Sequence, residues 1–410
     1  MKINFLKSTM LAGILALTGC SSEEIIDGAT SGMSLQPGEN LVKISLTSTT
    51  TRSPRPIGST EADNNIDRIA FKLVSTTTGK MTDAPIEGVY TTENGDKNPS
   101  GYTVQDNVIK LSDQNEFTVY IRFSTTMAEG RYNIVAYGYN SDGNEGFPYT
   151  MAAATSSTEY MPISCTVGAD DVVEEIFAGY CTVYVNQHGK FTTQPVINMK
   201  RQVAALLAYM GDVPAYVGTT KVAKVVISTY ASITGFKIPA AYLSPATDNG
   251  IFGDKSGTTR VNLLEFTLTG ASNYRTASPG ATYTFSGSEG EKYILADGMA
   301  EIEGLVCADH TLFGSCFLLP YGGTFDLSGD GKAPLNIEYL DETGKTILLA
   351  PLKNGGDMNY KICCNYIYSI GTKISVEEAG TPANIDEASG FSDMELSITE
   401  NWDNTVSLIK

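Results

Sequence analysis

Phe117-Thr-Val-Tyr-Ile-Arg-Phe123 is the stretch that decides the fold class of this chain, because apolar residues occupy every second position in it. Side chains two residues apart lie on the same face of a β-strand, so this pattern predicts a half-buried strand. Leu41-Val-Lys-Ile-Ser-Leu46, Asp67 to Val74 and Tyr132 to Tyr139 repeat the pattern. Further strands are expected at Cys181–Val185, Val196–Ala208, Lys224–Thr229, Asn262–Leu268, Leu335–Leu340, Thr346–Leu349, Tyr366–Ile374, Met394–Ile398 and Thr405–Ile409.

Clusters of Gly, Asn, Asp and Ser separate these strands, which favours antiparallel β-structure. No long stretch has the 3.6-residue period of a helix; the best helical candidate, Gln202–Met210, is equally readable as a strand. We therefore expect an all-β chain built from antiparallel sandwiches. A polar turn between Asn186 and Lys190 precedes a new apolar run. It predicts an N-terminal sandwich over residues 41–192 and a C-terminal sandwich over 193–410.

The first residues are typical of a cleavable export signal. Lys2 and Lys7 precede the apolar run Leu11–Leu17, which is too short to span a bilayer, and small residues lead into Cys20. Leu17-Thr-Gly-Cys20 resembles a lipobox, in which the cysteine is acylated and the chain is cut just before it. The alternative is an ordinary signal peptide with a chance cysteine. We expect residues 1–19 to be a lipoprotein signal peptide, Cys20 the lipidation site, and 20–40 a flexible tether.

The polar run Ser21-Ser-Glu-Glu24 follows the acceptor cysteine. It resembles the signal that sends lipoproteins of the Bacteroides group to the outer face of the outer membrane. A plain solvated tether is the alternative. The resemblance predicts a surface-exposed protein held in the outer membrane through its lipid.

The charge of the chain argues against one class of partner. The formal net charge is −18, and loss of residues 1–19 removes two lysines and no acids, giving −20. So acidic a protein repels phosphate backbones, and we expect no nucleic-acid partner.

Catalytic and metal-binding motifs are not found in the sequence. His188 and His310 lie far apart, which disfavours a zinc site or a serine triad. Asp326–Gly331 resembles a calcium loop, but the residue at the position of its final ligand is Ile337 rather than a glutamate. Paired carboxylates of a glycosidase stay possible, although Trp402 is the single tryptophan for a sugar platform. We expect a protein that is not an enzyme, with no cofactor and no metal.

Six cysteines follow Cys20, and an exported chain can form disulfides. The close pairs Cys165/Cys181 and Cys307/Cys316 could bridge, but sequence does not fix connectivity. Cys363 and Cys364 are adjacent and would point to opposite faces of one strand. We expect most of the six to be buried core thiols, and a disulfide at any one of them is the alternative.

Several segments, in order along the chain, resemble the fimbrillin superfamily, the two-domain subunits of the type V pili of Bacteroidales. One is Glu175–Gly179 followed by Val196-Ile-Asn-Met-Lys-Arg-Gln-Val-Ala204, like the family's link into its second domain. The others are Tyr137-Gly-Tyr139, Phe317-Leu-Leu-Pro320 with Leu335–Tyr339 and Thr343-Gly344, and Asn365-Tyr-Ile-Tyr-Ser-Ile370.

The resemblance implies two transthyretin-like β-sandwich domains and assembly with other fimbrial subunits by strand exchange. In stalk subunits of that family, a trypsin-like maturation protease cuts after an arginine that follows the first strand, and a neighbour's C-terminal strand replaces it. Here the candidate displaced strand carries Val42, Ile44 and Leu46, and the candidate cleavage site is Arg52, in a Thr/Ser-rich stretch. The candidate donor strand carries Val406 and Leu408.

Three functions follow from these expectations. The first is a structural subunit, stalk or tip, of a cell-surface fimbrium that supports adhesion. The second is an anchor of the same superfamily, which would keep its lipid and its first strand. The third is a surface glycan-binding lipoprotein.

Overall fold

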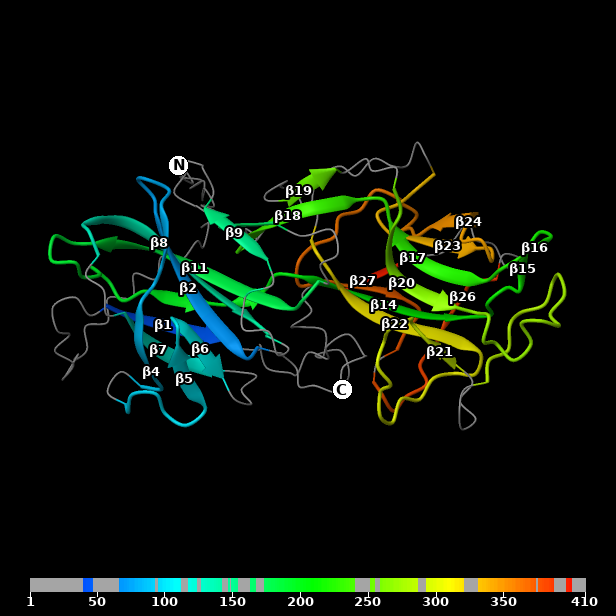
Figure 1. Cartoon of the computed structure of the whole chain (residues 1–410), viewed down its shortest axis with the longest axis horizontal. Coiled ribbons are helices and arrows are strands. Elements are labelled where there is room, and N and C mark those ends of the chain that lie inside the picture. The colour runs from blue at the N-terminus through cyan, green and yellow to red at the C-terminus, as the bar shows by residue number, and fades with distance from the viewer. Residues whose placement is uncertain are drawn as a thin grey trace, which may run out of the picture. The chain divides into compact units, whose positions relative to one another are not determined.

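The computed structural model describes residues 40–46, 66–92, 95–111, 117–123, 127–141, 147, 149–153, 163–166, 173–239, 251–254, 259–286, 293–320, 331–373, 375–386 and 396–399. Every regular element within these ranges is a β-strand (Figure 1). The expected all-β sandwich class is therefore confirmed. The described part of the chain holds no helix with the length and apolar character needed to cross a membrane.

Two facing sheets form the N-terminal sandwich, which also takes in two short strands from the segment beyond residue 192. The first sheet has the order β12-β1-β7-β4, and the second β13-β11-β8-β2-β6-β5, with β3 on β2. The first contains β12 (Val196–Asn198), β1 (Asn40–Leu46), β7 (Phe117–Phe123) and β4 (Ile86–Tyr90). The second contains β13 (Lys200–Arg201), β11 (Ile176–Val185), β8 (Gly130–Tyr139), β2 (Arg68–Ser75), β6 (Val108–Leu111), β5 (Tyr102–Gln105) and β3 (Met81–Asp83).

A third, smaller sheet covers the other face of the second one. It has the order β19 (Ile251–Asp254), β18 (Ser232–Ile238), β10 (Ile163–Thr166) and β9 (Thr150–Ala153). Strand β8 therefore has apolar neighbours on both faces: Ile134 and Ala136 pack into the core shared with β1, and Val135 and Tyr137 into the core shared with β10 and β18. Because both faces of β8 are buried, apolar and polar residues no longer alternate strictly toward the end of Tyr132–Tyr139.

Apart from β18 and β19, the strands after β13 form a second sandwich around its own core. One sheet has the order β21-β22-β14-β25-β27, with β26 on β14, and the other β20-β17-β23-β24; β15 and β16 pair as a hairpin. The first contains β21 (Tyr293–Leu295), β22 (Thr311–Leu318), β14 (Ala204–Gly211), β25 (Ile367–Ile370), β27 (Ser397–Thr399) and β26 (Ala383–Asn384). The others are β20 (Val261–Thr267), β17 (Lys224–Thr229), β23 (Asn336–Leu340), β24 (Thr346–Pro351), β15 (Tyr216–Val217) and β16 (Thr220–Lys221).

Most strand pairs are antiparallel, as expected, but four are parallel: β1–β12, β14–β25, β14–β26 and β21–β22. The expected strand Val196–Ala208 is divided into β12, β13 and β14. The helical candidate Gln202–Met210 is largely strand β14. Division of the chain into domains at residue 192 stays a prediction.

A buried ion pair lies where the chain passes between the two sandwiches. Arg201 Nε donates to Glu175 Oε1 over 2.7 Å, and both side chains are essentially inaccessible to solvent. The Arg201 guanidinium also lies 4.9 Å from the ring centroid of Phe177 and donates to Asn365 Oδ1 over 3.4 Å. A buried charge of this kind is tolerated because it is paired and hydrogen-bonded.

The six described cysteines are free thiols. Cys165 packs into the core beneath β10 and β18, and Cys181 into the core beneath β1, so the second sheet separates them. Cys316 and Cys307 likewise belong to clusters on different sides of β14 and β22. Burial raises the pKa of the Cys165 and Cys316 thiols to about 12, which keeps them protonated and unreactive.

Candidate functional site

Strand β1 lies in the interior of its sheet rather than at the edge, although it is the first strand described (Figure 1). It pairs antiparallel with β7 along its whole length, from Asn40 opposite Phe123 to Leu46 opposite Phe117. On its other side it pairs parallel with β12, with Lys43 opposite Val196. Its departure would therefore leave β12 without a partner in this sheet and one side of β7 unpaired, while β7 keeps β4 on its other side.

One face of β1 belongs to the core of the N-terminal sandwich. Val42 and Ile44 are completely buried and Leu46 is 3% exposed. All three pack with β7 and β11 side chains such as Val119, Ile121 and Phe177. These are the three residues that the sequence predicts for a displaced strand, and the structure brings them together on one apolar face.

Polar contacts fix the position of β1 along its neighbours. The buried Asn40 side chain donates from Nδ2 to the Gly189 carbonyl over 3.0 Å, and its Oδ1 accepts from the Phe191 N–H over 2.8 Å. Ser45 Oγ donates to Asn198 Oδ1 over 2.6 Å. Asn40 was not among the sequence-predicted site residues; the available signal was a polar residue directly before an alternating run.

Backbone bonds complete the link between β1 and β12. The Lys43 N–H donates to the Pro195 carbonyl and the Met199 N–H to the Ser45 carbonyl, each over 2.9 Å. Gly179 of β11 permits β12 to come this close, because a Cβ there would stand 2.4 Å from the Asn198 carbonyl oxygen. The pairing of β12 with β1 therefore requires a glycine at position 179.

Cations cover the aromatic rings on the opposite face of this sheet. Lys43 Nζ lies 6.0 Å from the centroid of Tyr120, and the Arg122 guanidinium 4.6 Å from that of Tyr90. Arg122 also donates to the Tyr90 hydroxyl over 3.2 Å. Cation–π contacts of this kind stabilise the sheet.

The other sequence-predicted site residues lie outside the described residues: Cys20, Arg52, Val406 and Leu408. The calcium-like segment Asp326–Gly331 is outside them as well, except for Gly331. Within the described ranges, no three His, Cys, Asp or Glu side chains are grouped so that they could hold a metal ion.

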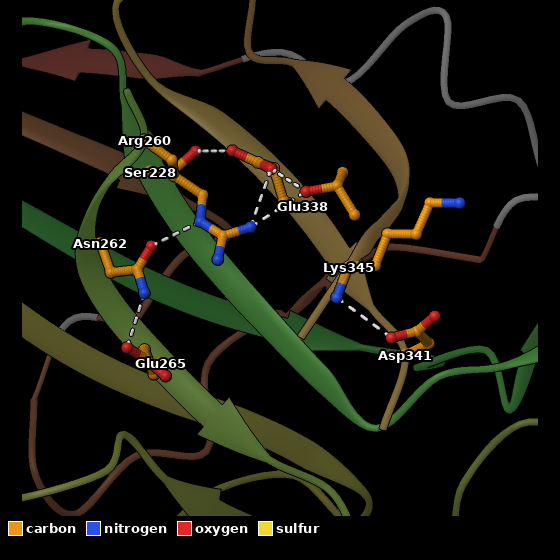
Figure 2. Close-up of polar contacts among 8 residues, drawn as sticks. Ser228, Arg260, Asn262, Glu265, Glu338, Asp341 and Lys345 are labelled. Atoms are coloured by element: carbon orange, nitrogen blue, oxygen red, sulfur yellow. Dashed lines mark hydrogen bonds and ion pairs between the residues drawn. The ribbon is translucent and has the colours of Figure 1, made fainter. Parts of the chain in front are cut away.

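A polar cluster on the C-terminal sandwich gathers around Glu338 of β23 (Figure 2). The fully buried Glu338 carboxylate accepts hydrogen bonds from Ser228 Oγ, from Thr346 Oγ1 over 2.7 Å and from Arg260 over 3.5 Å. Burial is the main cause that raises the pKa of the neighbouring Tyr230 to about 12, and the Glu338 carboxylate raises it further.

Next to this cluster, Arg260 Nε donates to Asn262 Oδ1 over 2.9 Å and Asn262 Nδ2 to Glu265 Oε1 over 2.7 Å. Lys224 Nζ bonds the other Glu265 oxygen over 2.9 Å, and this bond and the Asn262 bond lower the pKa of Glu265. Asp341 accepts from Thr343 and from the Lys345 N–H, which closes the turn between β23 and β24 and lowers the Asp341 pKa. The cluster thus joins β17, β20, β23 and β24 through a connected set of hydrogen bonds.

The chain is weakly similar to solved structures from Bacteroides and Parabacteroides species. A candidate adhesin from Bacteroides thetaiotaomicron is 12% identical with a TM-score of 0.35, over 77% of this chain and 81% of that one. A candidate cell adhesion protein from Parabacteroides distasonis is 10% identical with a TM-score of 0.36, over 89% and 96%. Another from Bacteroides eggerthii is 12% identical with a TM-score of 0.33, over 89% and 94%.

No protein-family model matches the chain. No curated protein matches it at the sequence level either.

Proposed function

We propose that this chain is a structural subunit, stalk or tip, of a cell-surface fimbrium. In this proposal it is exported as an outer-membrane lipoprotein acylated at Cys20 and assembled with other subunits by protease-triggered strand exchange. The observation that carries the proposal is β1. A strand that begins 20 residues after the acceptor cysteine fills the interior of a sheet with an apolar face, and an arginine follows it six residues later.

Cleavage after Arg52 would change how β1 is held. Hydrolysis of the Arg52–Ser53 peptide bond consumes one water and leaves β1 joined to its sandwich by non-covalent contacts alone. Those contacts are the β7 and β12 ladders, the Asn40 and Ser45 hydrogen bonds and the burial of three apolar side chains. A strand from a second subunit could supply the same kinds of contact, so the exchange would be close to neutral in free energy.

An empty β1 position would also be reactive toward other chains. The unpaired N–H and C=O groups of β7 and β12, together with the uncovered apolar core, form a template for an added strand. Cleavage further separates the sandwiches from the lipid on Cys20. Release from the membrane and competence to polymerise would thus follow from the same cut.

The anchor alternative uses the same architecture without the cut. A subunit that keeps β1 and its lipid would stay on the membrane and act once, at the base of a fimbrium.

The glycan-binding alternative has less support from the described residues. Among them, Tyr184 is the single aromatic that stands clearly exposed, at 46%, and its hydroxyl donates to Glu129 over 2.7 Å.

The test is the N-terminal sequence of protein sheared from cells, together with its migration on unheated denaturing gels. The proposal expects a chain that begins at Ser53 and a ladder of polymers. Arg52→Ala should abolish both, whereas Arg55→Ala, next to Pro56, is the matched control and should leave both intact. Membrane-held protein with acylated Cys20 and an intact β1 contradicts the stalk reading and favours the anchor.

A further inference from the structure

The C-terminal segment of this chain repeats the sequence pattern of β1. The repeat includes an asparagine, a residue that strand exchange in general does not require. Strand β1 reads Asn40-Leu-Val-Lys-Ile44, and the segment near the C-terminus reads Asn404-Thr-Val-Ser-Leu408. Both have Asn, then an apolar β-branched residue two positions later, then a second aliphatic residue two positions after that. In β1, Asn40 is 1% exposed, and its side chain makes two hydrogen bonds.

We propose that Asn404 is a register-setting residue: it takes the place of Asn40 when the C-terminal strand of a second copy of this chain replaces β1. Its amide then donates to the Gly189 carbonyl and accepts from the Phe191 N–H. Val406 lies where Val42 lay, and Leu408 where Ile44 lay. This inference rests on the proposed function, because it presupposes that β1 leaves, and it adds the partner and the alignment.

Burial at the β1 position discriminates between the possible alignments. A slip of two residues in one direction puts Asn404 at the place of Val42, and in the other it puts Lys410 at the place of Ile44; both places are completely buried. A slip of one residue turns Ser407 toward one of these two places, at the expense of Val406 and Leu408. Each alternative buries a polar or charged group among apolar side chains, which is costly without a partner.

The proposed alignment pairs Asn404 and places Lys410 at the last residue of the strand. Lys410 then takes the place of Leu46, which is 3% exposed and ends the ladder opposite Phe117, so its aliphatic part packs where Leu46 packed and its charged group extends past the strand end toward water. Asn404 meets the two backbone groups that Asn40 satisfied, the Gly189 carbonyl and the Phe191 N–H. A donor without this asparagine leaves both groups unpaired.

Disulfide mapping between two copies tests the register directly. One copy carries Ser407→Cys as donor; the other is cut after Arg52 and carries a cysteine on β7. In the proposed register Ser407 takes the place of Lys43, which pairs with Tyr120. Ser407→Cys should therefore crosslink to Tyr120→Cys at least tenfold more than to Thr118→Cys or Arg122→Cys, the β7 neighbours two residues away. Ser407→Cys paired with an acceptor that has no added cysteine controls for the native thiols.

A binding measurement isolates the asparagine. A peptide of residues 400–410 is titrated into the cut protein, with Trp402 fluorescence as the signal. Asn404→Ala should weaken binding about tenfold, because two hydrogen bonds are lost. Asn404→Asp should weaken it further, because a carboxylate faces the Gly189 carbonyl. Asp403→Asn, one position before the matched strand, should bind as the unmodified peptide does.

The outcomes distinguish an error in the proposed register from a failure of strand exchange itself. Crosslinks at Thr118 or Arg122 in place of Tyr120, or equal binding of the Asn404→Ala peptide, overturn the register while strand exchange stands. Absence of any crosslink between copies, with no peptide binding, overturns both the register and the exchange itself. A C-terminal strand that pairs within its own sandwich would give that second result.

Discussion

Strands β1 and β14 occupy interior positions in their sheets, yet they are built in different ways. All eight residues of β14 are buried, and its two faces contact different apolar clusters, one with Leu206 and one with Tyr209. Strand β1 has one fully apolar face, and the other carries Lys43 and Ser45. The chain continues from β14 into structure at both ends, through β13 and β15, whereas β1 is preceded by the predicted tether. The proposed removal of β1 rests on these two features, a single apolar face and a connection to the predicted tether.

The largest expected effect falls on β14. Leu206→Ala removes a completely buried side chain from the core of the C-terminal sandwich, and should lower the free energy of unfolding by about 2–5 kcal/mol. The loss should be the same in uncut monomer and in assembled polymer, since β14 stays in place in both. Urea denaturation of the two forms measures it, and a cost confined to the monomer would show that β14 is exchanged too.

Ile44→Ala sharpens the contrast, because its effect should depend on the state of assembly. In the uncut chain it removes a completely buried side chain and should cost about 2–4 kcal/mol. In polymer assembled after cleavage at Arg52, another strand fills the position and the substitution should cost nothing. The same urea titrations decide it; an undiminished cost in the polymer means that β1 never left.

A smaller loss is expected at the polar cluster of the C-terminal sandwich. Glu338→Gln weakens the hydrogen bonds from Ser228, Thr346 and Arg260, and should reduce the free energy of unfolding by about 1–3 kcal/mol. The change should leave the assembly ladder intact, because the cluster lies on β17, β20, β23 and β24, which take no part in the proposed exchange. Glu301→Gln, at an exposed position, is the control and should be neutral. A lost ladder in Glu338→Gln would tie this cluster to assembly.

The smallest effect is a change in pH dependence at Glu265. Hydrogen bonds from Lys224 and Asn262 lower the pKa of this carboxyl in the folded chain. Its contribution to stability is therefore present above the unfolded pKa of about 4.3 and is lost as the pH falls through the lower folded value. Thermal unfolding across this range should show wild type losing its small advantage over Glu265→Gln on acidification. A constant difference down to the lowest pH would contradict the shift.

Period-two alternation was sufficient to predict strands whose two faces differ in polarity. Phe117–Phe123 and Lys224–Thr229 have the bounds that the sequence predicts, and β1 differs by one residue. Strand β22 escaped prediction, because Thr311–Leu318 is apolar with small residues at its centre and lies between two clusters, so no alternation marks it. Strands β9, β10 and β19 were missed because each has only four residues, and β18 was missed because Gly235 interrupts its alternation where its pairing with β19 is irregular.

The candidate site was predictable in part for the same reason. The apolar face of β1 could be identified from alternation, since Val42, Ile44 and Leu46 are spaced two apart. The parallel partner β12 could not be predicted, because 153 positions separate Lys43 from Val196, its partner on β12, and Gly179 is the single sequence sign of the close approach. The role of Asn40 could not be predicted either, since its hydrogen bonds go to Gly189 and Phe191, in a loop whose position the sequence does not determine.

The pairing of β1 with β12 makes the connection between the sandwiches sensitive to what occupies the N-terminal one. β12 is joined to β1 through Pro195, Asn198 and Met199, and two residues later the chain reaches Arg201 and its buried partner Glu175. When the β1 position is empty, this connecting segment keeps its contacts on one side only. When a strand enters, the segment is held on both sides again. In the proposed exchange, loss of β1 after cleavage would loosen this link and entry of a strand from a second subunit would restore it, so that the cut, unassembled subunit is the state in which the link is least rigid.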